Sequence, residues 1–176
     1  LPVWQRECGR AGLDPQKPAP VPVAAPPGIE ILGAVDIDHL AATTFEADTS
    51  EANGSSISFL AEYAGRRVLF TGDGFPQVLV ANIQRLISNQ GQQKLKVSAI
   101  KLPHHGSKAN VSQDLLDLLE CRRYLFSTNG ETSSRHPDEV AVARVIRFGG
   151  PKPELIFNYR SEANKPWGNP DLIRTY

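Results

Sequence analysis

The chain has 176 residues, of which 40% are hydrophobic and 22% charged, the ordinary composition of a globular domain. Lysine plus arginine and aspartate plus glutamate number 19 each, so the formal net charge is zero, which argues against a globally basic nucleic-acid-binding protein. Cys8 and Cys121 are too few for a disulfide framework or a cysteine-rich zinc site, which predicts a reduced, cytoplasmic protein. No apolar run approaches the roughly 18 residues of a membrane-spanning helix, so we expect no membrane segment.

The sequence contains no methionine, not even at its start. At a usual methionine frequency of about 2%, total absence from a chain of this length is improbable. We therefore expect a processed chain, or a piece cut from a longer product.

Composition divides the chain into three parts. Residues 1–28 hold half of the 14 prolines and have no helical or strand period, which predicts an extended arm or connector. Residues 29–160 carry the periodic segments and are expected to form the folded domain. Residues 161–176 have no period and are expected to be a tail packed on the surface.

The first half of the folded part is predicted to be strand-rich. Ile29–Asp36 alternates loosely and predicts a strand, and residues 38–50 predict an acidic loop. Within it, His39 is expected to be a surface or hydrogen-bonded histidine, with a metal ligand as the alternative. Alternation predicts a further strand over Ile57–Tyr63. Ala64-Gly65-Arg66 then predicts a hairpin turn into an antiparallel strand that ends at Phe70.

Helices and strands alternate after the hairpin. Apolar residues at helical spacing predict a core-facing helix over Gln77–Ser88, and an apolar, β-branched run beginning at Val97 predicts a buried strand. Ser112 is a good N-cap for a helix that extends through Leu119.

The last elements continue this alternation. Arg123–Ser127 predicts a strand, Pro137 fits the first position of the next helix, and Glu154–Tyr159 predicts a final strand. Alternation of this kind predicts an α/β fold in which helices face a sheet.

Two adjacent histidines follow the central strand. Pro103 ends that strand because proline cannot donate to a sheet ladder, and His104 and His105 come next. In α/β folds, ligands bind at the carboxyl ends of the strands. Imidazoles suit a metal ion, whereas the hydroxyl of Ser107 and the ammonium of Lys108 suit a phosphate. A solvated polar loop is the alternative.

Two further residues are site candidates. Asp73 also ends a strand, between two glycines that allow a tight turn, and its carboxylate suits zinc, manganese or iron. A plain turn aspartate is the alternative. His136 precedes a predicted helix start, where phosphates bind readily, with an N-cap or surface histidine as the alternative.

Four stretches together resemble the metallo-β-lactamase superfamily, and most closely the branch that includes the hydrolase domain of bacterial DNA-uptake channel proteins. They are Asn53–Ile57, Leu69–Asp73, Leu102–Ser107 and His136-Pro137, in the family's order from about residue 28 to about residue 160.

The resemblance implies an α/β fold with a mixed sheet and helices on its outer face. It also implies a metal-dependent phosphodiesterase, most plausibly a nuclease, with two divalent metal ions: zinc, or manganese as the alternative. Asp73 would bridge both ions and His105 would bind one of them. His104 would contact the substrate phosphate, and His136 would lie near the active site.

The family's His-x-His-x-Asp-His motif is absent, and the nearest string, Asp36–His39, has one histidine. We therefore expect the chain to be the C-terminal half of an αββα sandwich, completed by an N-terminal half as its partner and acting on nucleic acid. One face of its sheet would lie bare. Two alternatives remain open: a non-catalytic regulatory or interaction half, and a hydrolase of small esters.

Overall fold

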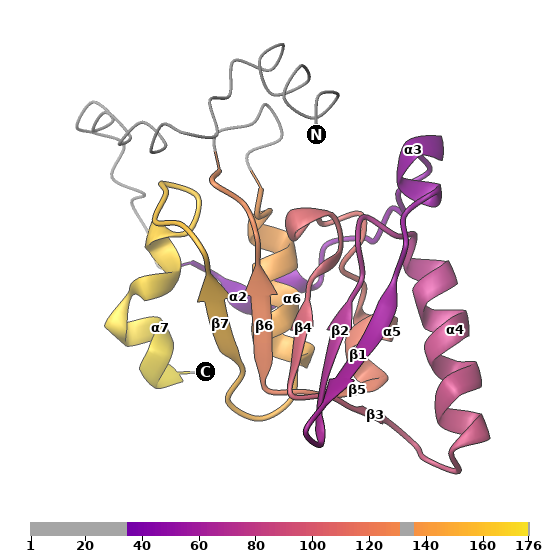
Figure 1. Cartoon of the computed structure of the whole chain (residues 1–176). Helices are drawn as coiled ribbons and strands as arrows, with labels where there is room; N and C mark the ends of the chain where they lie inside the picture. The colour runs from indigo at the N-terminus through magenta and orange to yellow at the C-terminus, as the bar shows by residue number, and fades with distance from the viewer. Residues whose placement is uncertain (1–34, 131–135, 176) are drawn as a thin grey trace, which may run out of the picture. The chain divides into compact units, whose positions relative to one another are not determined.

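A computed structural model describes residues 35–130 and 136–175, and Figure 1 shows their arrangement. The predicted proline-rich arm, residues 1–28, lies outside the described residues, as does nearly all of the strand predicted over Ile29–Asp36. In the described part of the chain, every helix is too short or too polar to cross a membrane.

The predicted hairpin is confirmed. Strands β1 (Phe59–Tyr63) and β2 (Arg66–Phe70) pair antiparallel, with Tyr63 opposite Arg66. The two loop residues, Ala64 and Gly65, have φ angles of 48° and 70°. Two successive positive φ angles match a type I′ turn, whose twist suits the flanking strands.

The main sheet is mixed, as the alternation of elements predicts. Its strand order is β1-β2-β4-β6-β7, with β4 at Ala99–Lys101, β6 at Arg123–Phe126 and β7 at Glu154–Phe157. The pairs β2–β4, β4–β6 and β6–β7 are all parallel. The carboxyl ends of four strands therefore meet at one edge. A small parallel sheet joins β3 (Leu95–Lys96) to β5 (Leu119–Glu120).

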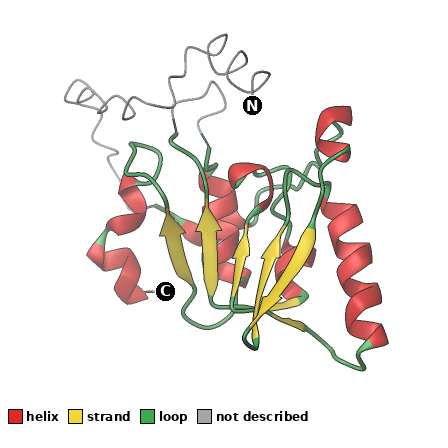
Figure 2. Ribbon diagram, viewed as in Figure 1, coloured by secondary structure: helices red, strands yellow, loops and turns green. Residues whose placement is uncertain are grey.

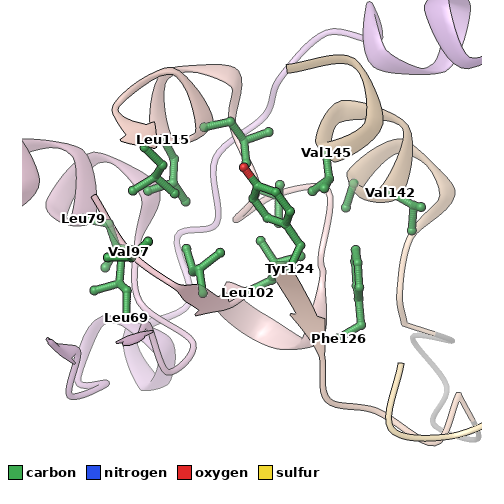
Figure 3. Close-up of a cluster of buried hydrophobic side chains, with 14 of the residues drawn as sticks. Leu69, Leu79, Val97, Leu102, Leu115, Tyr124, Phe126, Val142 and Val145 are labelled. Carbon is green, nitrogen blue, oxygen red and sulfur yellow. The ribbon is translucent and has the colours of Figure 1, made fainter. Parts of the chain in front are cut away.

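Helices cover one face of this sheet (Figure 2). The crossovers run through α4 (Pro76–Asn89), α5 (Gln113–Asp117) and α6 (Glu139–Phe148). The strand residues Leu69, Ile100 and Tyr124 are adjacent in register and at most 6% exposed. Figure 3 shows the core that they form with side chains of the helices, among them Leu79, Leu115, Val142 and Val145.

The opposite face of the sheet carries a row of four apolar side chains and one lysine, which we call the open face. In register, it consists of Phe59, Phe70, Lys101, Leu125 and Ile156. The exposed fractions of Phe59, Phe70 and Ile156 are 53%, 36% and 40%. The described helices do not cover this row, so the predicted bare face is observed within the described chain.

The loop predicted over residues 38–50 is wrong at its start. Ile37–Ala41 is a short helix, α2, rather than a loop. The side chain of Asp36 caps it by accepting from the His39 N–H at 2.9 Å, and Ile37 and Ala41 are buried against the core. Glu51–Gly54 forms a second short helix, α3.

Predictions for the helices α5 and α6 hold in part. Ser112 caps α5, because its Oγ accepts from the Leu115 N–H at 3.2 Å, but α5 ends at Asp117 and Leu119 belongs to β5. Helix α6 begins at Glu139, not at Pro137, which follows a cis peptide bond.

The tail is more ordered than the sequence predicts. Residues 161–176 include a 3₁₀ helix, η2 (Lys165–Gly168), and a last helix, α7 (Pro170–Thr175). Trp167 in η2 is 6% exposed and joins the core, so this segment packs into the domain rather than only on its surface.

A buried arginine on α6 holds the loop after the histidine pair. Arg144 is 3% exposed. Its guanidinium donates to the carbonyl oxygens of Lys108 at 2.7 Å, Val111 at 2.9 Å and Thr43 at 2.9 Å. One side chain therefore ties α6 to two loops that flank the sheet edge.

We expect Arg144→Met to lower the free energy of unfolding by about 3 kcal/mol, because it leaves three carbonyl oxygens without their charged donor. Arg147→Met is the matched control. Arg147 pairs with Asp38 at 2.9 Å where both side chains are more than half exposed, so its loss should cost about 0.5 kcal/mol. Urea unfolding of both variants measures the change in the free energy of unfolding. Equal decreases for the two variants would contradict a role for Arg144 in holding the loops.

Candidate functional site

The sheet edge brings Asp73 beside the histidine pair, because β2 and β4 are parallel neighbours. The ends of these strands are tied together. Thr71 Oγ1 donates to the Lys101 carbonyl at 2.6 Å, and the His104 N–H donates to the Gly72 carbonyl at 3.0 Å. The predicted convergence of Asp73, His104 and His105 is thus what the structure shows.

The ring of His105 is oriented by the next strand of the sheet. Its Nδ1 bonds to the backbone carbonyl of Ser127, just after β6. A carbonyl only accepts, so Nδ1 carries a proton, and in the neutral imidazole the lone pair is on Nε2. Nε2 lies 4.0 Å from Asp73 Oδ1. Metal-binding histidines usually donate their other N–H to a carbonyl or carboxylate, so this is the arrangement expected of a ligand.

The histidine pair lies in a strained turn. The φ angles of His104, His105 and Gly106 are 45°, 58° and 88°, all in the left-handed region. Such angles cost non-glycine residues of order 1 kcal/mol or more and persist only where the surroundings impose them. A Cβ on Gly106 would meet the Phe126 ring at 2.7 Å. The close packing and the left-handed backbone conformation together place both imidazoles on one short loop.

His136 lies in the same cluster, and it is buried rather than a surface residue. It is 7% exposed, and its ring centroid lies 5.1 Å from that of His104. Burial lowers the pKa of His136, although the nearby Asp138 carboxylate raises it. Asp138 occupies the N-cap position of α6, so the alternative of His136 as N-cap is wrong. Nδ1 of His136 makes no hydrogen bond to any described residue.

The two predicted phosphate contacts after the histidines differ in accessibility. Ser107 is 5% exposed, and its Oγ accepts from the Ala109 N–H at 3.2 Å, so the hydroxyl serves the turn itself. Lys108 is exposed, and its backbone N–H donates to Asp138 Oδ2 at 2.7 Å. Of this pair, only Lys108 has a side chain at the surface of the site.

Sequence reasoning missed Lys101 as a site residue. Its Nζ lies 4.0 Å from Asp73 Oδ1 and donates to the Gly72 carbonyl at 3.4 Å. Burial lowers the pKa of Lys101, and the Asp73 carboxylate partly opposes that shift. The pairing of β2 with β4 places Lys101 beside Phe70 in register, and no local sequence pattern links Lys101 to Asp73.

A second carboxylate, Asp48, also approaches the histidines. Its Oδ2 lies 3.5 Å from His104 Nδ1. Burial alone would raise the pKa of Asp48. Hydrogen bonds from the Ser50 N–H and from the amides of Asn53 and Asn110 outweigh burial and lower it. Asp48 is therefore ionised at neutral pH. No sequence pattern links it to His104. His39, by contrast, is exposed on α2.

The donor set fits part of a metal centre. Two ligands of one tetrahedral zinc ion lie about 3.4 Å apart, so the 4.0 Å between Asp73 and His105 needs only a small closure. Among the described residues, however, no group of three or more His, Cys, Asp or Glu side chains is arranged to hold a metal ion. Two donors would leave half of a four-coordinate zinc shell to other ligands.

Comparisons of the chain with family models, with curated proteins and with solved structures find no match.

Proposed function

We propose that this chain is the C-terminal half of a metallo-β-lactamase-like, metal-dependent phosphodiesterase, acting as a nuclease together with a first-half partner. The observation that carries the proposal is the orientation of His105. Its Nδ1 is held by the Ser127 carbonyl, and its Nε2 lone pair lies 4.0 Å from the Asp73 carboxylate at the carboxyl edge of the sheet.

Each residue of the cluster has a proposed role. Asp73 and His105 would hold two divalent ions, zinc or manganese, which when bound stabilise the charge of the reacting oxygens and activate water. His104 and Lys108 would bind the nonbridging phosphate oxygens. His136, nearly buried beside His104, would support that contact, and Ser107 would shape the turn that presents it.

The partner is proposed for two reasons. First, Asp73 and His105 alone would leave a divalent ion largely hydrated and weakly bound. Second, the open face exposes the apolar side chains of Phe59, Phe70 and Ile156, and an apolar patch of this kind is typical of an interaction site. A first half would supply about four metal ligands and cover the open face, burying more than roughly 2,000 Å² in an obligate interface.

A non-catalytic interaction half is the second candidate. The observation that favours it is the Lys101 ammonium, 4.0 Å from Asp73 Oδ1, where it would neutralise the carboxylate without a metal ion. In this version the open face is the functional surface, and the histidine cluster is a polar structural element.

The test uses residues 1–176 alone and the longest product of the same gene that contains them. Measurements are light scattering, metal content, and cleavage of plasmid and single-stranded DNA beside a panel of small esters. We expect the 176-residue chain to associate and to be inactive, and the longer product to bind two metal ions and cleave DNA. A soluble monomer that binds two metals and cuts DNA unaided would contradict the need for a partner. A metal-free longer product would favour the interaction half, and cleavage of esters alone would favour the small-ester hydrolase.

A further inference from the structure

A buried amide lies behind His104 and joins it to Asp48. Asn110 is 0% exposed. Its Nδ2 lies 3.1 Å from Asp48 Oδ2, 3.3 Å from the Gly74 carbonyl and 3.4 Å from the Asp73 carbonyl. All three neighbours are oxygen acceptors, so this end of the amide must be its NH₂ group. The amide oxygen of Asn110 therefore faces His104.

This orientation decides where the proton of His104 lies. Nδ1 of His104 is 3.1 Å from Asn110 Oδ1 and 3.5 Å from Asp48 Oδ2. Both oxygens only accept, so Nδ1 must be the donor. The Asn53 amide nitrogen lies 3.3 Å from the same Nδ1, farther than the Asn110 oxygen, and it makes its short hydrogen bond to Asp48 Oδ2 at 2.6 Å. Nε2 of His104 makes no hydrogen bond to the described residues, and it is left for a ligand.

The Asp48 segment is anchored to the loop that carries Asn110. The Asp48 N–H donates to the Ala109 carbonyl at 3.0 Å, and Asp48 Oδ1 accepts from the Ser50 N–H at 2.8 Å. These bonds fix the carboxylate relative to His104 without help from the imidazole. The acceptors behind His104 are therefore in place before any substrate arrives.

We propose that Asp48 and Asn110 are positioning residues that hold His104 with its proton on Nδ1, so that Nε2 alone meets the substrate. This deepens the proposed function and rests on it for the identity of the substrate. His105 reaches the same tautomer through a different partner, the Ser127 carbonyl. The two adjacent histidines thus each present Nε2, although nothing in their common loop requires it.

The test is the tautomer of His104 in the full chain labelled with ¹⁵N-histidine. Two-bond ¹H–¹⁵N correlation spectra distinguish the two neutral tautomers, and His104→Gln assigns the signals. We expect the Nδ1–H form for His104 in the unmodified protein. In Asp48→Asn and in Asn110→Ala, we expect a mixture of both tautomers at His104. The pattern of His105 should stay unchanged in the same spectra, and Asp114→Asn, at an exposed carboxylate on α5, is the matched control.

In the longer, active product we expect each variant to lose activity about tenfold to hundredfold, the size usual for residues that orient a site histidine. Two results would overturn the inference without affecting the proposed function. One is the Nε2–H tautomer of His104 in the unmodified chain, and the other is an unchanged His104 pattern in both variants. The opposite result is also possible: His104 has the Nδ1–H tautomer, the variants show a mixture of tautomers, and the protein does not cleave phosphodiesters. This result would support the inference and overturn the proposed function.

Discussion

Under the proposed function, Asp73→Ala is expected to lower DNA hydrolysis by several orders of magnitude and to reduce metal binding. The reason is that Asp73 would be one of the residues that hold the ions, and these ions would supply the chemistry. The fold should survive the change. The Asp73 side chain is 35% exposed, and its ion-pair partners Lys101 and His105 are both 4.0 Å away, so the loss of stability should be about 1 kcal/mol or less.

Metal content, kcat/KM and urea unfolding of the same preparations measure these effects. Asp114→Ala is the control, because Asp114 is an exposed carboxylate in the first turn of α5, away from the strand ends. It should keep full activity and a full complement of metal. If Asp73→Ala keeps its metal and cleaves DNA at the normal rate, the bridging role is wrong.

Ile156→Asp is expected to weaken association with the proposed first half about a hundredfold to a thousandfold, the loss usual for a residue that contributes strongly to an interface. Ile156 is 40% exposed on the open face, next to Leu125 in register. Covering a carboxylate there with apolar surface would bury a charge without a partner, which is strongly unfavourable. The chain alone should fold as before, because the side chain does not belong to the core beneath the helices.

Val78→Asp provides the matched control for the open face. Val78 is also β-branched and is 51% exposed, but it lies on α4, which packs on the other side of the sheet. Sedimentation of each variant with a separately produced first half measures the affinity. Equal affinities for both variants would show that the open face is not the interface.

Sequence reasoning predicted the elements whose signals are local. The hairpin at Ala64-Gly65 follows from turn chemistry between two alternating runs, and α4 follows from apolar residues at helical spacing. The Ser112 cap is visible because a hydroxyl precedes an apolar helical run. The carboxyl edge could also be predicted, since alternating strands and helices imply parallel strands that end together.

Elements that depend on distant contacts were misplaced. Pro137 suits the first turn of a helix, yet α6 begins two residues later, because the Asp138 N–H bonds to the Gly106 carbonyl of the histidine loop at 3.0 Å. Leu119 continues an apolar helical stripe, yet it pairs with Leu95 in a small sheet. In both places a tertiary hydrogen bond or strand pairing overrides the local preference.

The same division holds at the site. The placement of Asp73, His104 and His105 after strands could be predicted from the sequence, because each comes shortly after an apolar run. Tertiary contacts determine which atoms of these residues face one another. Asp48 and Asn110, 62 residues apart, meet behind His104, and Lys101 reaches Asp73 from the neighbouring strand. The physical reason is that periodicity and turn chemistry act over a few residues, whereas hydrogen bonds of a site join whichever polar groups the packed core brings within about 3 Å.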